Sequence, residues 1–279
     1  MKKMFIKLVL FFALVALLIF TAFYSGIVVR HYTLDSKAVK DGRGMRIALI
    51  SDLHGYIYGD KQDVLIKKLA GQNPDLVVMA GDMVDKDTTL EATRLLCEGF
   101  KDLSPTVPIV YVVGNHESDL DDVDEIKNSI RKFGVTVLED ECLRFNLNGT
   151  NVLISGVQSP YISKVKKAYS SMKNKFAPSV VKNAYKVLVV HQPEHIEEYL
   201  QYDFDLILSG HTHGGQVRIP FMSNGLYAPN QGVFPKYAGG MYTHDDTTHI
   251  ISRGLVIDDD IPRIFNPPEI VIIDVVAPD

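Results

Sequence analysis

The chain has 279 residues, and its apolar fraction of 46% is enough to build a sizeable core in one large domain or two small ones. The net charge of −5 comes without a long basic run, so nucleic acid is not an expected partner. The two cysteines, Cys97 and Cys142, lie far apart and outside any Cys-x-x-Cys pattern, which excludes a disulfide framework and a cysteine zinc site. One bridge between them stays open, but two free, buried thiols are the preferred interpretation.

The N-terminal segment has the composition of a membrane-spanning helix. Residues 8–29 form an uncharged, mostly apolar run between Lys7 and Arg30, and a spanning helix needs roughly 20 such residues. The alternative is a cleaved signal peptide, whose apolar core of about 7–15 residues is followed by small residues. Phe23 and Tyr24 place bulky side chains where cleavage needs small ones. We therefore expect an uncleaved anchor over residues 1–30.

The charges on either side of this run are balanced. Lys2, Lys3 and Lys7 precede it, and basic residues follow it at positions 30, 37, 40 and 43, so the positive-inside count does not decide the orientation. The very short basic tail before a signal-like apolar core favours a cytoplasmic N-terminus. The expected location is a single-pass membrane anchor with the rest of the chain outside the cytoplasm.

After the anchor, residues 31–44 are expected to form an extended approach segment, and residues 45–279 alternate apolar runs with helical spacing. Buried strands are predicted at 45–51, 76–80, 109–113, 186–190, 206–208 and 269–276. Helices are predicted at 60–70, 88–103, 119–133 and 194–200, and in part over 164–182. Runs at 135–138, 143–147 and 152–155, bounded by Asn148-Gly149, predict antiparallel hairpin strands. The alternation implies α/β layers with a mixed sheet, and because no linker divides residues 45–279, we expect one domain there.

The most distinctive motif is Gly210-His211-Thr212-His213-Gly214-Gly215-Gln216, directly after a predicted strand. Its glycines permit close backbone approaches, and imidazole is the commonest protein ligand for transition metals. Four other predicted strand ends carry candidate ligands: Asp52 and His54, Asp82, Asn115 and His116, and His191. In open α/β sheets, ligands collect outside the carboxyl ends of strands. Mixed oxygen and nitrogen ligation suits Mn²⁺, Fe²⁺ or Zn²⁺ better than Mg²⁺ or Ca²⁺.

The ordered series Asp-x-His, Gly-Asp-x-x-Asp, Gly-Asn-His-Glu, a lone His and Gly-His-Thr-His resembles the calcineurin-like metallophosphoesterases over about residues 45–275. Three later stretches extend the resemblance to a membrane-associated bacterial branch: Phe234-Pro235-Lys236-Tyr237, Ser252-Arg253-Gly254 and Pro267-Pro268-Glu269-Ile270. Some relatives in that branch hydrolyse UDP-2,3-diacylglucosamine or related phosphodiesters. The resemblance implies a four-layer α/β/β/α sandwich with mixed sheets, preceded here by one transmembrane helix.

The resemblance also implies two divalent metal ions as cofactors. One would be held by Asp52, His54, Asp82 and His213, and the other by Asp82 as a bridge with Asn115, His191 and His211. His116 would protonate the leaving oxygen or stabilise charge on the phosphate. Three neighbouring residues carry two interpretations each. Asp85 and Glu117 either orient ligand histidines or are solvated loop acids, and Arg253 either meets a phosphate or forms a structural ion pair.

Other histidines and aromatic residues are interpreted as ordinary structure. His31, His195, His244 and His249 lie outside the motif series and are expected on the surface or in packing. Tyr56, Tyr58, Phe221 and Tyr227 could line an apolar substrate groove, although core or surface packing is preferred.

Together these features predict a membrane-anchored, dinuclear metal-dependent phosphoesterase acting on a phosphodiester or pyrophosphate. The leading substrate class is a lipid-linked or nucleotide-sugar-lipid phosphoester at the membrane. Two alternatives stay open: a phosphatase or nucleotide phosphodiesterase on soluble substrates, and a non-catalytic scaffold that keeps the fold. Because the chain retains every ligand position together with His116, the enzyme is preferred over the scaffold.

Overall fold

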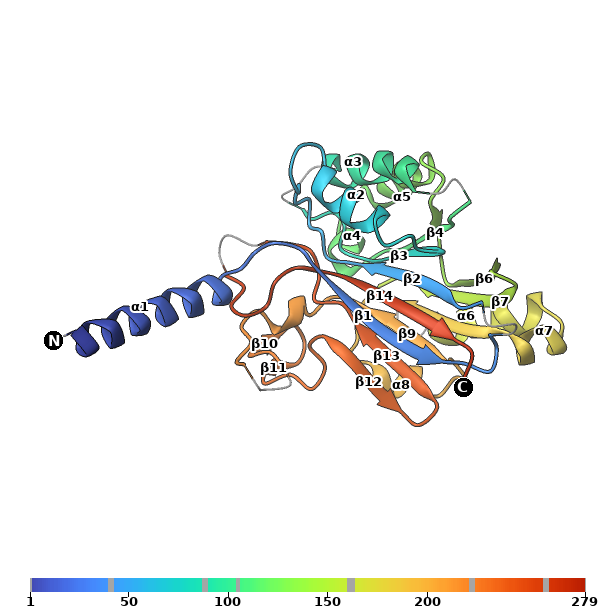
Figure 1. The fold of residues 1–279 in the computed structure, drawn as a ribbon. Coiled ribbons are helices and arrows are strands. Elements are labelled where there is room, and N and C mark those ends of the chain that lie inside the picture. The colour runs from blue at the N-terminus through green and yellow to red at the C-terminus, as the bar shows by residue number, and fades with distance from the viewer. Residues whose placement is uncertain are drawn as a thin grey trace.

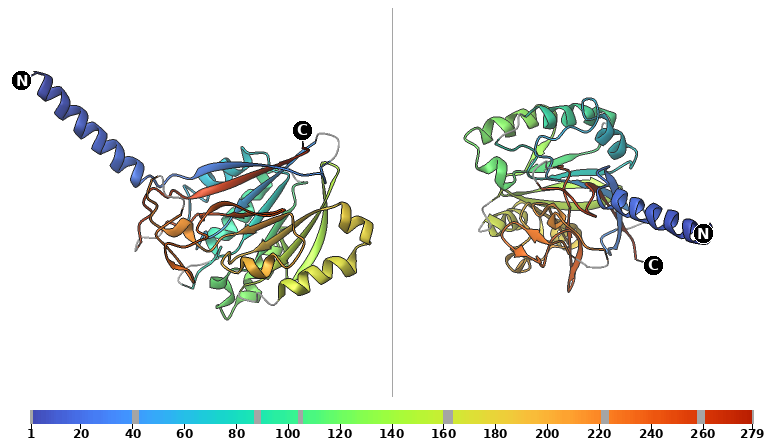
Figure 2. Two further views of the ribbon diagram at one scale, coloured as in Figure 1. Left: turned by 90° about the horizontal axis from the view of Figure 1, so that it is seen from below. Right: turned by 90° about the vertical axis from the view of Figure 1, so that its left-hand side faces the viewer.

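The computed structural model describes residues 2–39, 43–86, 90–103, 106–159, 164–220, 224–257 and 261–278. Helix α1 (Lys2–Ala22) projects from a body built on two six-stranded sheets (Figure 1, Figure 2). α1 is long and apolar enough to cross a membrane, and none of its apolar window is buried against the body. A signal sequence at this place would meet the same criterion.

The first sheet has the strand order β1-β14-β2-β3-β4-β5. Its strands are β1 (Val28–Asp35), β14 (Glu269–Val276), β2 (Met45–Ile50), β3 (Leu76–Ala80), β4 (Ile109–Val112) and β5 (Thr136–Val137). β14 runs antiparallel to β2, and all other neighbours in this sheet are parallel. Every residue of β3 and β4 is buried, as expected for parallel strands that are covered on both faces.

The second sheet has the order β12-β13-β9-β8-β7-β6. Its strands are β12 (Gly240–His244), β13 (Thr247–Ile251), β9 (Leu206–Ser209), β8 (Tyr185–Val190), β7 (Thr150–Val157) and β6 (Glu141–Leu147). The pairs at the two edges are antiparallel, and the four central strands are parallel. A small separate hairpin is formed by β10 (Tyr227–Ala228) and β11 (Gly232–Val233).

Helices cover the outer face of each sheet (Figure 1). Over the first sheet lie α2 (Asp63–Ala70), α3 (Glu91–Gly99) and α5 (Val123–Arg131), and over the second lie α6 (Val165–Lys175), α7 (Pro178–Asn183) and α8 (Ile196–Tyr199). Leu96 packs in the core under the first set of helices, and Val78 and Leu208 pack in the core between the sheets. Tyr199, the last residue of α8, packs in the core under the second set of helices. The predicted four-layer α/β/β/α sandwich with mixed sheets is confirmed.

The N-terminal apolar run differs from the prediction of one helix over residues 8–29. α1 ends at Ala22, Ile27 is buried in the core under the first sheet, and Val28 begins β1. β1 is rich in β-branched and aromatic residues, which favour strands, and it pairs with β14 over its whole length. Residues 31–35 of the expected approach segment are therefore part of the sheet.

Two further predictions can be compared with the structure. β6 and β7 form an antiparallel pair around Asn148-Gly149, as predicted. β5, predicted as a hairpin strand, instead pairs in parallel with β4 because the chain crosses over through α5 before reaching it. The beginning of the predicted helix 88–103, including Thr88 and Thr89, lies outside the described residues, and α3 covers its middle.

The pairing of the first sheet fixes the edge at which α1 joins the body. Val28, the first residue of β1, pairs with Glu269, the first residue of β14. Because β14 is antiparallel to β2, Val271 near the start of β14 pairs with Leu49 near the end of β2. The chain therefore enters the body from α1 at the end of the sheet at which β2 finishes.

Candidate metal centre

The carboxyl ends of strands from both sheets converge on one cluster of acidic and imidazole side chains. β2, β3 and β4 lead to it from the first sheet, and β8 and β9 lead to it from the second. The side chains form three groups whose ligand atoms lie within 4.8 Å of one another: Asp52, His54 and His213; His54, Asp82 and His116; and Asp82, His191 and His211. The structure thus brings together all the Asp and His residues that the strand ends offered as candidates.

The backbone of this cluster adopts a conformation that is uncommon outside glycine. The angle φ is 52° at Asp52, 46° at His54, 54° at Asp82, 73° at His211 and 47° at His213. Positive φ brings the β-carbon close to the backbone, and a left-handed residue costs roughly 1–2 kcal/mol. Such conformations persist where the surrounding structure enforces them, and they concentrate at functional sites.

Two glycines allow the loops to approach the carboxylates. A β-carbon on Gly114 would lie 2.0 Å from Asp82 Oδ1, and one on Gly210 would lie 2.5 Å from Asp52 Oδ2. Both distances are far below any van der Waals contact, so only glycine fits at either position. The glycines that precede Asn115 and His211 are therefore explained by the packing of the loops on these two carboxylates.

Asp82 occupies the centre of the cluster. Its side chain is 1% exposed, and its Oδ1 accepts a hydrogen bond from the backbone N–H of His116 at 3.0 Å. Its Oδ2 lies 2.9 Å from His191 Nε2 and 3.6 Å from His54 Nε2. A single carboxylate thus faces imidazoles from both sheets, which is the position that a bridging ligand requires.

Several buried polar atoms of the cluster make no hydrogen bond within the described residues. They are Asp52 Oδ2 and Asn115 Oδ1, and beside them Asp82 Oδ2 and His191 Nε2 face each other at 2.9 Å. Buried polar groups without partners are costly, so their convergence on one point indicates a bound cation. His191 donates its Nδ1–H to the Ala80 carbonyl at 2.7 Å, which leaves its Nε2 as the metal-facing atom.

The electrostatics of the cluster also favour a cation. Burial opposes ionisation of Asp52, but His213 and His191 lower the pKa of this carboxyl to about 2. Burial acts in the same direction on Asp82 and is again outweighed, chiefly by His191, so the pKa of Asp82 lies well below its usual value. Burial and the charge of His191 lower the pKa of His211 to about 3. At neutral pH the two carboxylates are therefore ionised and His211 is neutral, which are the forms that bind metals.

The pKa of His191 shows how strongly the carboxylates attract positive charge. Burial alone would lower this pKa, yet Asp82 and Asp52 raise it to about 10. A metal ion bound at this point would supply the positive charge that otherwise comes from a proton on His191.

The segment that carries this cluster matches a known protein family. The family described as calcineurin-like phosphoesterase matches residues 45–215, which is more than half of the chain. The chain belongs to this family. The matched range begins at the first residue of β2 and ends just beyond His213, so it includes every side chain of the cluster. Calcineurin-like phosphoesterases use two divalent metal ions, and the clustered Asp and His residues fit this requirement.

Two relatives with similar sequences are named as metallophosphoesterases. The chain is 29% identical to an uncharacterized metallophosphoesterase of Campylobacter jejuni, over 83% of this chain and 59% of that one. It is 26% identical to an uncharacterized metallophosphoesterase of Aquifex aeolicus, over 88% of this chain and 90% of that one. Among solved structures it is similar to the Haemophilus influenzae NAD nucleotidase, with a TM-score of 0.49 and 16% identity over 78% of this chain and 52% of that one. The chain spans little more than half the length of the Campylobacter and Helicobacter pylori relatives.

Asp85 of the calcineurin-like motif contacts two histidines at once. Its Oδ2 lies 2.9 Å from His54 Nδ1, and its Oδ1 lies 2.9 Å from His116 Nδ1. Hydrogen bonds from the two imidazoles, with burial opposing, hold the pKa of Asp85 well below its usual range. The structure thus places an ionised carboxylate where it orients both rings.

Glu117 differs from the expectation that it orients a histidine or lies in solvent. It is fully buried, and its carboxylate accepts backbone N–H groups of Asp82 at 2.9 Å, Val84 at 3.1 Å and Gly114 at 3.0 Å, together with that of Met83. The four hydrogen bonds that its carboxylate accepts from N–H groups are all with the main chain and not with an imidazole. Glu117 therefore joins the loops after β3 and β4, which carry Asp82 and α4 (Asn115–Ser118).

Arg253 also takes the more structural of its two interpretations. Its backbone N–H donates to Glu269 Oε1 at 3.0 Å, and its Nε lies 3.6 Å from Glu269 Oε2. Arg30 contacts the same buried carboxylate. Burial lowers the pKa of Arg253 to about 10, with Glu269 opposing. The described contacts of Arg253 are those of a buried ion pair with Glu269.

The structure adds two residues that the sequence did not suggest. Asn230, next to β11, lies with its Nδ2 3.2 Å from His211 Nε2 and 2.8 Å from Glu194 Oε1. Glu194 Oε1 lies 3.8 Å from the same imidazole atom, and its Oε2 is buried without a described hydrogen bond. Glu194 follows His191 by three positions, which is a weak signal, whereas no local pattern points to Asn230.

The remaining histidines and aromatic residues lie outside the cluster. His249 is buried, with its Nε2 3.1 Å from Ser209 Oγ, and His31 is exposed on β1. Tyr58 is buried and donates its hydroxyl to the Leu255 carbonyl, so it belongs to the core. Phe221 lies outside the described residues.

Proposed function

We propose that this chain is a dinuclear metal-dependent phosphoesterase that hydrolyses a phosphodiester or pyrophosphate bond at a membrane surface. The observation that carries the proposal is the convergence of buried carboxylate, amide and imidazole groups in three overlapping sets, two of which contain Asp82. The first metal would be held by Asp52, His54, Asp82 and His213, and the second by Asp82, Asn115, His191 and His211. These mixed oxygen and nitrogen donors suit Mn²⁺, Fe²⁺ or Zn²⁺.

The protein orients these groups before any metal binds. The Ala80 carbonyl fixes His191 with its Nε2 turned inward. Asp85 contacts Nδ1 of His54, so that Nε2 of His54 faces His213 Nε2 at 3.2 Å. Two divalent ions supply a hydroxide near neutral pH and stabilise charge on the phosphoryl oxygens.

His116 is proposed to protonate the leaving oxygen. It is 39% exposed, the most accessible imidazole of the cluster, so a substrate can reach it. Asp85 contacts its Nδ1 at 2.9 Å, which leaves Nε2 as the free atom. Histidine is the side chain that most often transfers protons in enzyme active sites.

The position of α1 supports a substrate at the membrane. β1 begins after α1 at the end of the sheet at which β2 finishes, and Asp52 follows β2 at that same end. If α1 anchors the chain, the metal centre faces the side of the body from which the anchor leaves. A lipid-linked phosphoester, such as a nucleotide-sugar lipid, then lies within reach without leaving the bilayer.

The decisive experiment joins metal analysis to a substrate panel. Purified full-length protein is assayed on phosphomonoesters, phosphodiesters and nucleotide-sugar lipids, and its metal content is measured. We expect two metals per chain and the highest kcat/KM on a lipid-linked phosphodiester or pyrophosphate. Highest efficiency on water-soluble esters would replace the substrate proposal with a soluble-substrate phosphatase, and two metals without hydrolysis would favour a scaffold.

The location is tested separately. An uncleaved α1 predicts that the protein fractionates with membranes and resists alkaline carbonate extraction, with the body outside the cytoplasm as the proposed orientation. Protease added to intact cells or spheroplasts should then degrade the body. Recovery of a mature chain that begins near Gly26, just before β1, would show instead that the segment is a signal peptide.

A further inference from the structure

Exposed apolar side chains outside α1 are concentrated in one part of the sequence. Five of them, Ile219, Leu226, Tyr227, Val233 and Phe234, surround the β10–β11 hairpin and are called the apolar rim below. Val233 and Phe234 are 63% and 64% exposed, and Tyr227 is 52% exposed. Exposed apolar side chains gathered around one hairpin in this way are candidates for contact with a partner or a membrane.

Backbone hydrogen bonds connect the apolar rim to the end of α1. The N–H of Phe265 donates to the carbonyl of Ala22, the last residue of α1, at 2.7 Å. The neighbouring Ile264 pairs with Val217 and accepts the N–H of Arg218 at 2.8 Å. Leu226 then donates to Val217 at 2.8 Å, so α1 and the rim are held in one hydrogen-bonded layer.

The views of the fold agree with this connection. The β10–β11 hairpin lies at the end of the body from which α1 departs (Figure 1, Figure 2). Phe234, which follows β11, donates its N–H to Leu226 at 2.8 Å. The most exposed side chain of the rim is therefore fixed to this layer and not placed on an independent loop.

We propose that the apolar rim inserts into the interfacial region of the bilayer that α1 crosses. This inference rests on the anchor in the proposed function. A spanning α1 places Ala22 near the membrane surface, and the hydrogen-bonded layer then holds the rim at the same level. Tyrosine is favoured at the membrane interface, and the exposed Lys236 beside Phe234 suits anionic headgroups. A lipid surface is therefore the occupant that the position, composition and charge of the rim favour.

The insertion has a consequence for the metal centre. The same hairpin carries Asn230, whose Nδ2 lies 3.2 Å from His211 Nε2, and Leu226 donates to Gly215 in the His-Thr-His-Gly-Gly loop at 3.0 Å. The rim and the second metal position thus share one short segment. Docking of the rim directs the metal centre toward phosphoester groups that stand at the bilayer surface.

The absence of tryptophan from the sequence allows a direct test. Phe234→Trp introduces a single fluorophore in the rim. Phe145→Trp is the matched control. Phe145 on β6 pairs with Val152 near the start of β7, so it lies at the opposite end of the sheets from the rim. Each full-length variant is reconstituted into vesicles of phosphatidylcholine and phosphatidylglycerol that carry bromine at defined acyl positions.

We expect bromines near the headgroups to quench the fluorescence of Phe234→Trp several-fold more than that of Phe145→Trp, and the emission of the rim variant to be blue-shifted. Equal quenching of the two variants would overturn the proposal. Absence of quenching in Phe234→Trp together with a concentration-dependent dimer in detergent would overturn it in favour of a second copy of the chain. Because quenching needs no turnover, an inactive protein whose rim fluorophore is quenched would refute the proposed function and leave the rim assignment intact.

Discussion

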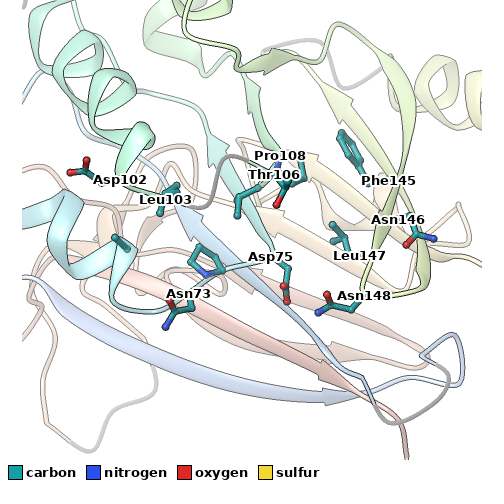
Figure 3. A pocket seen from close by; sticks show the side chains of 13 residues that line it. Asn73, Asp75, Asp102, Leu103, Thr106, Pro108, Phe145, Asn146, Leu147 and Asn148 are labelled. Atoms are coloured by element: carbon teal, nitrogen blue, oxygen red, sulfur yellow. The ribbon is translucent and has the colours of Figure 1, made fainter.

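The end of the sandwich at which the parallel strands finish differs in its polar side chains from the end at which these strands begin. At the carboxyl end, where β2, β3, β4, β8 and β9 finish, buried carboxylate, amide and imidazole groups converge, and some of their oxygen atoms have no described hydrogen bond. At the amino end lies a cavity of about 530 Å³ between the first sheet, η1 (Phe100–Asp102) and the β6–β7 turn (Figure 3). Asn73, Asp75, Phe145 and Asn148 are among its lining residues.

The difference shows that the volume of a cavity does not locate chemistry. The polar groups at the amino end are engaged in structure: Asp75 accepts the backbone N–H of Arg46 at 2.7 Å, and Asn148 donates to the Gly44 carbonyl at 2.9 Å. No histidine or cysteine appears among the described residues that line this cavity. At the carboxyl end, by contrast, Asp52 Oδ2 and Asn115 Oδ1 are buried without a described hydrogen bond, next to the facing atoms Asp82 Oδ2 and His191 Nε2. Unsatisfied donors and acceptors, rather than space, distinguish the candidate site.

The largest difference in metal content and activity is expected between Asp82→Asn at the carboxyl end and Asp75→Asn at the amino end. Asp82→Asn removes the carboxylate that faces both proposed metal positions, so both metals should be lost. Activity should fall by more than the roughly 10²–10⁴-fold that a general acid contributes. Asp75→Asn at the amino end should retain both metals and full activity. Elemental analysis and kcat/KM measure both effects, and full metal content in Asp82→Asn would count strongly against the bridging assignment.

A smaller effect separates proton transfer from metal binding at the carboxyl end. His116→Gln should keep both metals and much of its activity on nitrophenyl esters, since nitrophenolate leaves without a proton. On alkyl phosphodiesters the loss should reach about 10²–10⁴-fold. The measurement is kcat/KM for wild type and variant across leaving groups of graded pKa. A variant slope no steeper than that of wild type would exclude the general-acid role.

Glu194 tests whether a carboxylate next to a proposed ligand histidine affects metal binding at the carboxyl end. Its carboxylate lies 3.8 Å from His211 Nε2, so Glu194→Gln should weaken binding of the second metal. Residues that contact a ligand histidine typically change metal affinity or activity by about 10–100-fold. Glu197→Gln, at an exposed position of α8 in the following turn of the chain, is the matched control. Equal metal titrations for the two variants would show that Glu194 does not position His211.

The elements of the body that the sequence predicts well are those with local signals. The motif loops follow buried apolar strands, so the apolar runs alone place Asp52, Asp82 and His191 at strand ends. The Asn148-Gly149 turn between two apolar runs predicts the β6–β7 pair for the same reason. The convergence itself follows from the rule that carboxyl ends of parallel strands share one edge.

The elements that the sequence did not predict depend on distant partners. Val28 belongs to a strand because it pairs with Glu269, and an apolar run alone does not show where a helix gives way to a strand. Glu117 accepts the backbone N–H groups of Asp82, Met83 and Val84, and this loop reaches Glu117 only after β3 and β4 pair. Asn230 reaches His211 from a hairpin that no ligand pattern marks. In each case the tertiary fold, and not local composition, supplies the contact.

The smallest expected effect belongs to the amino end. Asn148 has a φ of 51°, and its Nδ2 donates to the Gly44 carbonyl. Asn148→Ala keeps neither the tolerance of positive φ nor the hydrogen bond, so it should destabilise the fold by about 1–2 kcal/mol. Asn148→Gly keeps the backbone freedom and should cost less, about 1 kcal/mol. Urea unfolding measures both changes. Since the metal centre lies at the opposite end, kcat/KM and metal content should equal those of wild type in both variants. Loss of either in a folded variant would show that the two ends are coupled.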